Sequence, residues 1–251
     1  MALPRGPLRD PRTVARDIPG IFDALFPQLA PGVVMHLNNT AASIDGCADV
    51  PGELILQSGL QHAMLFELAG AVAEQLLGQV AEPDWDAALT LAVRRQRRHF
   101  DARLPAEITQ NDKEVARRVS KNLQLMLTAL AGDSEIVISP HVPGLQWVAS
   151  GVGDFSFDST LVEVKCTGRR FGAADYRQIL MYWLLSYAAS IEGRGSEWSR
   201  ALLINPRQNL FVDISFNELI DLTGAGRSKV ELLQLFLWMV GDYSGRRVDH
   251  G

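Results

Sequence analysis

Apolar side chains recur every three or four positions over residues 60–131, a spacing that predicts a run of helices. The pattern is interrupted at positions that predict helix ends, namely Pro83, Pro105 and Gly132. Residues 1–50 differ, because they are rich in proline and glycine and hold only short apolar patches such as 21–26. We therefore expect a loosely packed N-terminal arm, followed by a helical extension.

After this helical stretch, the pattern changes to short strands that alternate with helices. Helical spacing predicts a helix over 111–127 and another over 175–190. Runs of β-forming residues predict strands between these helices and after the second one, within 136–149, 154–157, 160–165 and 201–214. Strands that alternate with helices in this way indicate an α/β domain.

Two of the predicted strands are separated only by Asp158 and Ser159, residues that favour a turn. A two-residue loop there forms a hairpin, and counting back along both strands places Asp154 opposite Glu163, with side chains about 5 Å apart. Lys165 projects from the same face, because side chains alternate along a strand. The hairpin therefore predicts two acids and a base on one face.

Opposed carboxylates repel each other unless a cation lies between them. Mg²⁺ suits this position, since one or two carboxylates often hold it while water and substrate phosphate take its other positions. It lowers the pKa of bound water and stabilises charge on a phosphodiester oxygen. We expect Asp154 and Glu163 to hold Mg²⁺, or Mn²⁺ in its place, and Lys165 to assist the attacking water. The alternative interpretation is a surface hairpin whose charges are only solvated.

The helix predicted over 175–190 brings two further polar residues to this region. Asp175 is a candidate N-cap, since its carboxylate can accept from the first backbone N–H groups. Gln178 and Tyr182 lie four positions apart and so share one face of the helix. Both side chains are candidates to contact phosphate or water.

The ordered set Asp154, Glu163-x-Lys165 and Gln178-x-x-x-Tyr182 resembles the PD-(D/E)XK nuclease superfamily, particularly its RecB-like branch. The resemblance covers about residues 111–220. It implies a mixed central sheet flanked by helices, with 111–251 as the nuclease core including a C-terminal helix, and 1–110 as the N-terminal arm and helical extension. It also implies that Asp154, Glu163 and the backbone carbonyl of Val164 bind the metal.

RecB-like enzymes often add a histidine and a glutamate from an earlier helix, and this position stays open between two candidates. His62 and Glu67 resemble that element, but five positions give an angular offset of about 140° on a helix. Glu114 lies in the helix just before the first strand. An ordinary polar helix face is the alternative interpretation of all three.

With a net charge of −5, the whole molecule is not a general polyanion binder, so DNA contact needs a local basic surface. The candidates are three clusters, formed by residues 94–98, by Arg117, Arg118 and Lys121, and by Arg169 and Arg170. The last pair directly follows the proposed active-site strand, where phosphates must be bound.

Composition limits the remaining possibilities. The 251 residues are 47% hydrophobic and 21% charged, as expected for a protein with an ordinary core. Residues 232–240 are apolar but too short to span a membrane, and the N-terminus lacks the apolar segment of a signal peptide, so we expect a cytoplasmic protein. Two cysteines, Cys47 and Cys166, are too few for the four-cysteine iron–sulfur cluster of some RecB-like nucleases.

The sequence thus predicts a metal-dependent deoxyribonuclease that binds DNA through its backbone. The resemblance implies a role in prokaryotic DNA repair, restriction or phage defence, with a partner protein such as an ATPase or helicase. The alternative is a catalytically silent scaffold of the same fold that binds DNA or protein, and a hydrolase that acts on RNA or nucleotides is a third interpretation. Endonuclease and exonuclease action are both compatible with the sequence.

Overall fold

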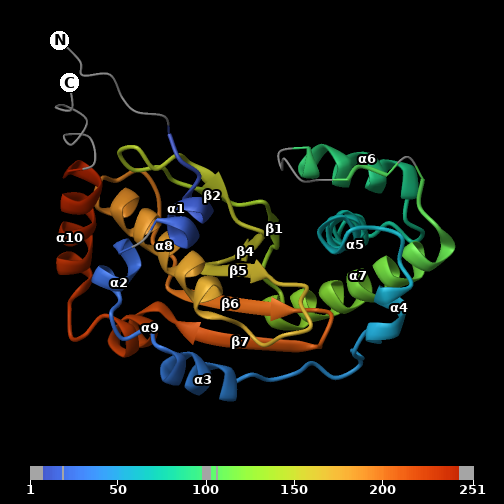
Figure 1. Ribbon diagram of the computed structural model, residues 1–251, viewed down its shortest axis with the longest axis horizontal. Helices are drawn as coiled ribbons and strands as arrows, with labels where there is room; N and C mark the ends of the chain where they lie inside the picture. The colour runs from blue at the N-terminus through green and yellow to red at the C-terminus, as the bar shows by residue number, and fades with distance from the viewer. Residues whose placement is uncertain (1–7, 19, 98–102, 106, 243–251) are drawn as a thin grey trace, which may run out of the picture.

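A computed structural model describes residues 8–18, 20–97, 103–105 and 107–242 of the chain (Figure 1). Its helices in chain order are α1 Pro11–Asp17, α2 Ile21–Leu25, α3 Pro31–Asn39, α4 Gly52–Leu56, α5 His62–Leu77, α6 Trp85–Gln96, α7 Gln110–Ala131, α8 Ala173–Ile191, α9 Phe216–Thr223 and α10 Lys229–Asp242. Its strands are β1 Val137–Ile138, β2 His141–Val142, β3 Gly151–Val152, β4 Phe155–Phe157, β5 Thr160–Val164, β6 Arg200–Asn205 and β7 Leu210–Ser215.

A five-stranded mixed sheet forms the centre of the fold, with the strand order β1-β4-β5-β6-β7. β5 and β6 are parallel, whereas the other neighbouring pairs are antiparallel. Parallel neighbours need a crossover connection, which α8 supplies between them. The mixed sheet with flanking helices confirms the α/β class predicted from the sequence.

Alternating side chains divide the sheet into two apolar faces. Leu161 and Leu203 point to the face covered by α8, while Val162 and Leu202 point to the opposite face. The C-terminal half of α7 covers this second face through Leu123, Met126 and Leu127. The first half of α7 continues beyond the sheet and packs against α4, α5 and α6, which form a separate apolar cluster (Figure 1).

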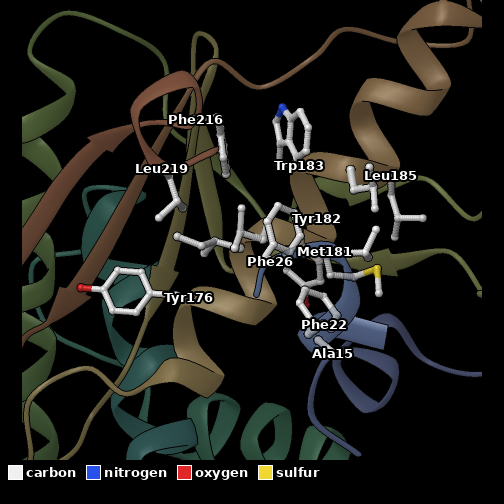
Figure 2. Close-up of a cluster of buried hydrophobic side chains, with 14 of the residues drawn as sticks. Ala15, Phe22, Phe26, Tyr176, Met181, Tyr182, Trp183, Leu185, Phe216 and Leu219 are labelled. Carbon is white, nitrogen blue, oxygen red and sulfur yellow. The ribbon is translucent and has the colours of Figure 1, made fainter. Parts of the chain in front are cut away.

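The expectation of a loosely packed N-terminal arm is wrong for the residues that the structure describes. α1 and α2 bury Val14, Phe22 and Phe26 in the same core as α8. Figure 2 shows Phe22 and Phe26 beside Met181 and Tyr182. Short helices rich in proline give too few turns for a periodic pattern, so the sequence does not reveal how much apolar surface they bury.

Within the described residues, no helix is both long enough and apolar enough to cross a membrane.

The C-terminal helix α10 has one buried side and one exposed side. Leu232, Phe236 and Val240 are buried against the core, whereas Trp238 is 64% exposed.

Packing of the N-terminal helices predicts a large cost for removing one of their buried rings. We expect Phe22→Ala, whose side chain is 3% exposed, to lower the free energy of unfolding by about 3–5 kcal/mol. Met35→Ala, at a 64% exposed position, should change it by less than about 0.5 kcal/mol. Chemical denaturation measures both, and equal effects of the two substitutions would contradict this packing.

Candidate active site

The hairpin predicted around Asp158 and Ser159 is confirmed. Phe157 pairs with Thr160, so the loop has two residues, and Asp158 adopts a positive φ of 47°. This left-handed conformation is tolerated by aspartate better than by most residues, and it suits a tight hairpin. Phe155 pairs with Val162, so Asp154, the residue immediately before β4, lies beside Glu163 near the end of β5.

Asp154 is fixed by the backbone of the neighbouring strand. Its Oδ2 accepts a hydrogen bond of 2.8 Å from the backbone N–H of Val164. The preceding Gly153 allows close packing, since an added Cβ would lie 3.2 Å from both Leu161 and Pro140. The two adjacent residues therefore have separate roles: Gly153 allows close packing, and Asp154 presents a carboxylate.

Glu163 is the most deeply buried acid of this group, with 1% of the residue exposed. Its Oε1 accepts hydrogen bonds from Lys165 Nζ at 2.8 Å and from Gln178 Nε2 at 2.6 Å. Its Oε2 is buried and has no hydrogen-bond partner in the part of the chain that the structure describes. Burial and the charge of Asp154 together raise the pKa of Glu163 from 4.5 to about 7.

Gln178 on α8 forms hydrogen bonds with residues of β5 and of the strand end. It also contacts Tyr182, with which it shares a helix face as their spacing predicts. Its Oε1 accepts from Lys165 Nζ at 2.8 Å, while its Nε2 donates to Glu163 and, at 3.2 Å, to the hydroxyl of Tyr182. The side chains of Glu163, Lys165, Gln178 and Tyr182 thus form one continuous hydrogen-bonded chain. All four were candidate site residues from the sequence, and the structure brings them together.

Asp175 is not the N-cap of α8. The helix begins at Ala173 with Gly172 as its N-cap, and the Asp175 carboxylate accepts from the backbone N–H of Gly172 at 2.8 Å. Asp175 also lies 3.8 Å from Lys165 Nζ. Asp175 is thus the third residue of the helix, and its carboxylate makes the reciprocal bond of a capping box, back to the N–H of the cap residue.

Lys165 remains positively charged in this environment. Burial alone lowers its pKa, but the charges and hydrogen bond of Glu163, together with Asp154 and Asp175, raise it overall. Lys165 can therefore donate hydrogen bonds and stabilise negative charge, and it does not serve as a proton acceptor near neutral pH.

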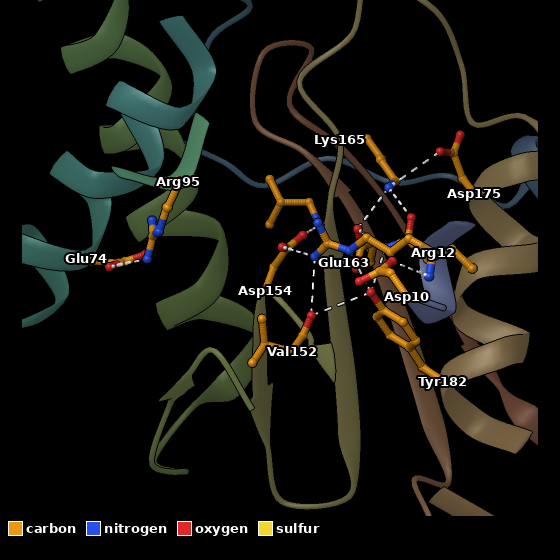
Figure 3. Close-up of polar contacts among 12 residues, drawn as sticks. Asp10, Arg12, Glu74, Arg95, Val152, Asp154, Glu163, Lys165, Asp175 and Tyr182 are labelled. Atoms are coloured by element: carbon orange, nitrogen blue, oxygen red, sulfur yellow. Dashed lines mark hydrogen bonds and ion pairs between the residues drawn. The ribbon is translucent and has the colours of Figure 1, made fainter. Parts of the chain in front are cut away.

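Arg12, on α1, is a site residue that the sequence analysis missed. Its Nε donates to the Tyr182 hydroxyl at 2.6 Å, and its Nη2 contacts Asp154 Oδ1 at 3.2 Å and the carbonyl of Val152 at 3.3 Å (Figure 3). Burial lowers the pKa of Arg12, but Glu163 and Asp154 raise it overall, so the guanidinium stays charged. No local pattern in residues 1–50 marks this arginine.

A cleft of about 540 Å³ separates the hairpin from helices α5 and α6. Arg12 and Asp154 line one wall, and Glu67 and Arg94 line the other. Figure 3 shows the ion pair between Glu74 and Arg95 across from the hairpin; the two side chains approach to 2.7 Å. Glu163 is not among the lining residues, because it lies buried behind this surface.

Glu67 faces this cleft, whereas the other two helix candidates do not. Burial, together with the charge of Asp154, raises the pKa of Glu67 despite the opposing charge of Arg95. Glu114 instead pairs with Arg118 at 2.7 Å on the surface of α7. His62 is exposed and lies against Phe66, outside the lining of the cleft.

The three basic clusters lie in different places. Arg94 and Arg95 line the cleft, while Arg98 is outside the described residues. Arg117 and Arg118 pair with Glu114, and Lys121 is exposed on α7. Arg170 donates to the backbone carbonyl of Asn38 at 2.8 Å, and neither Arg169 nor Arg170 lines the cleft.

The two carboxylates offer a small but chemically suitable set of metal ligands. Among the described residues, no group of three or more His, Cys, Asp or Glu side chains is arranged to hold a metal ion. Mg²⁺ needs only one or two carboxylates, since it keeps several waters. Within the described residues, Oε2 of Glu163 has no hydrogen-bond partner and Oδ1 of Asp154 is contacted by Arg12 alone, so these two oxygens fit such a minimal site.

Searches against family models, curated proteins and solved structures found no match to this chain.

The raised pKa of Glu163 predicts a pH effect on stability. The folded state holds this proton more tightly than the unfolded chain, so the contribution is present below pH 4.5 and is lost as pH rises through about 7. Between about pH 4 and about pH 8, metal-free wild type should lose about 3 kcal/mol of unfolding free energy more than Glu163→Gln. Denaturant titrations in EDTA measure the difference, and parallel pH profiles would contradict the raised pKa.

Proposed function

We propose that this protein is a metal-dependent nuclease with a PD-(D/E)XK core that hydrolyses phosphodiester bonds of DNA. The observation that carries the proposal is the cluster of Asp154, Glu163 and Lys165 on one hairpin face, extended by Gln178 and Tyr182 from α8. This cluster contains a buried carboxylate oxygen, Oε2 of Glu163, that has no partner over the described ranges of the chain. Such an atom costs free energy unless a ligand compensates it, so its presence supports a functional role.

The order of elements also supports the proposed core. From α7 to β6 the chain forms a helix, several short strands that end in the β4–β5 hairpin, a crossover helix and a strand parallel to β5. The proposed acids and base come from the hairpin, and the crossover helix contributes the glutamine and tyrosine. This arrangement is the one implied by the resemblance to RecB-like nucleases.

Each side chain of the cluster has a distinct chemical task in the proposed reaction. Asp154 and Glu163 would hold Mg²⁺, which supplies charge neutralisation and an acidified water when bound. Lys165 orients the attacking water and stabilises the charge that develops on the phosphate, because its ammonium group remains protonated. Gln178 positions both Glu163 and Lys165 through its amide.

The direct test is DNA cleavage by wild type and by Lys165→Ala. Linear duplex, circular duplex and single-stranded DNA, with an RNA control, are incubated with Mg²⁺, Mn²⁺ or EDTA. Wild type should cleave DNA only with metal, and Lys165→Ala should reduce the rate by about 100-fold or more. Cleavage of the circular substrate identifies endonuclease action.

Lys229→Ala is the matched control, since Lys229 pairs with Glu197 at 2.6 Å and lies outside the lining of the cleft, and it should cleave like wild type. Absence of cleavage by folded, monodisperse wild type under every condition would count against the nuclease and favour the catalytically silent scaffold.

Glu67 and Glu114 provide a second test, because only Glu67 faces the cleft that Asp154 lines. Glu67→Gln should raise the Mg²⁺ concentration needed for half-maximal cleavage by about tenfold, since removing a carboxylate near a metal site lowers metal affinity. Glu114→Gln should leave it unchanged. Magnesium titrations of the cleavage rate compare the two variants, and equal magnesium affinities would rule out Glu67 as the additional acid.

A further inference from the structure

The first turn of α1 is held rigidly beside the hairpin. Asp10 caps the helix by accepting the backbone N–H groups of Arg12 and Thr13. Residue Arg9 forms backbone hydrogen bonds with Trp147 and Ala149, at 3.0 and 2.8 Å. The backbone that carries Arg12 is therefore fixed before its side chain makes any contact.

The guanidinium of Arg12 is only partly used by the protein. Its Nε and Nη2 donate to Tyr182, Val152 and Asp154, but among the described residues its Nη1 has no partner. The contact with Asp154 is a single hydrogen bond of 3.2 Å, not the two parallel bonds of a forked ion pair. The side chain is 44% exposed and lines the cleft.

The charges around Arg12 favour an anionic ligand at this place. The carboxylates of Asp154, Glu163 and Asp175 exceed their partners Arg12 and Lys165 by one negative formal charge in the isolated protein. A divalent cation held by Asp154 and Glu163 would leave one surplus positive charge. A phosphodiester carries one negative charge, which would restore the balance.

We propose that Arg12 binds a phosphate group of the nucleic acid substrate through its unused Nη1, with Tyr182 holding the guanidinium in position. This inference rests on the proposed function and extends it, because it makes the N-terminal helix a part of the substrate site. Arginine suits this task, since its planar fork keeps its orientation when one edge is already bound.

The test measures DNA binding by fluorescence anisotropy, so that it does not depend on cleavage. A labelled single-stranded oligonucleotide is titrated in Ca²⁺, a hard divalent cation that oxygen ligands also hold, at several salt concentrations for wild type, Arg12→Ala and Arg12→Lys, and gel electrophoresis checks that the oligonucleotide stays intact. Arg12→Ala should weaken binding by about tenfold and reduce the slope of log K against log salt by about 0.7 to 1, as for one lost phosphate contact. Arg12→Lys should bind with intermediate affinity.

Arg200→Ala is the matched control for loss of one arginine. Arg200 is 50% exposed and forms an ion pair of 2.6 Å with Asp213, but it pairs with Thr160, at the opposite end of β5 from Glu163. The DNA affinity and the salt slope of Arg200→Ala should equal those of wild type. Thermal denaturation of each variant separates misfolding from lost binding.

Two outcomes would overturn the role of Arg12 and leave the proposed function intact. In the first, folded Arg12→Ala binds DNA like wild type. In the second, folded Arg12→Ala binds Mg²⁺ more tightly than wild type by calorimetry and cleaves DNA faster. The second outcome would mean that the guanidinium excludes the metal. Failure of wild type itself to bind DNA would overturn this inference together with the proposed action on DNA. Binding without cleavage in Mg²⁺ would overturn only the nuclease reaction.

Discussion

The placement of two carboxylates on one hairpin face, next to a buried core, is the constraint on which the rest of this site depends. Asp154 and Glu163 repel each other, and the burial of Glu163 removes water that would screen this repulsion. The surrounding structure compensates with Lys165, with Arg12 and with the backbone N–H of Val164. Compensation is incomplete at Glu163, whose second oxygen has no partner among the residues described and whose pKa is raised. This remaining electrostatic imbalance is the feature that supports the metal site we propose.

This requirement links parts of the chain that are far apart in sequence. α8 provides Gln178 and Tyr182, and the same helix packs against α1, which carries Arg12. The N-terminal segment therefore buries its apolar side chains and places Arg12 at the site through the same packing against α8. A change that loosens Phe22 or Phe26 from the core is expected to displace the guanidinium as well, since the two features share a short, continuous segment.

The helices α5 and α6 give the site its second wall, and they do so with mixed charge. Arg95 is neutralised by Glu74, whereas Glu67 has no hydrogen-bond partner in the described part of the chain and Arg94 is exposed. A cleft of this kind does not attract polyanions by net charge alone. The phosphate binding that we propose would therefore depend on individually positioned groups, which agrees with the overall charge of −5.

The sequence by itself determined the local geometry of the site, because that geometry follows from short-range periodicity. A two-residue turn and the alternation of a strand bring Asp154 to Glu163, and a spacing of four on a helix aligns Gln178 with Tyr182. Tertiary packing decided the rest. Arg12 lies 170 positions from Tyr182, and Glu67 and Glu114 are equivalent as polar positions until the packing of α5 and α7 turns one toward the cleft. Contacts between distant segments depend on the complementary surfaces of whole elements, which no local pattern encodes.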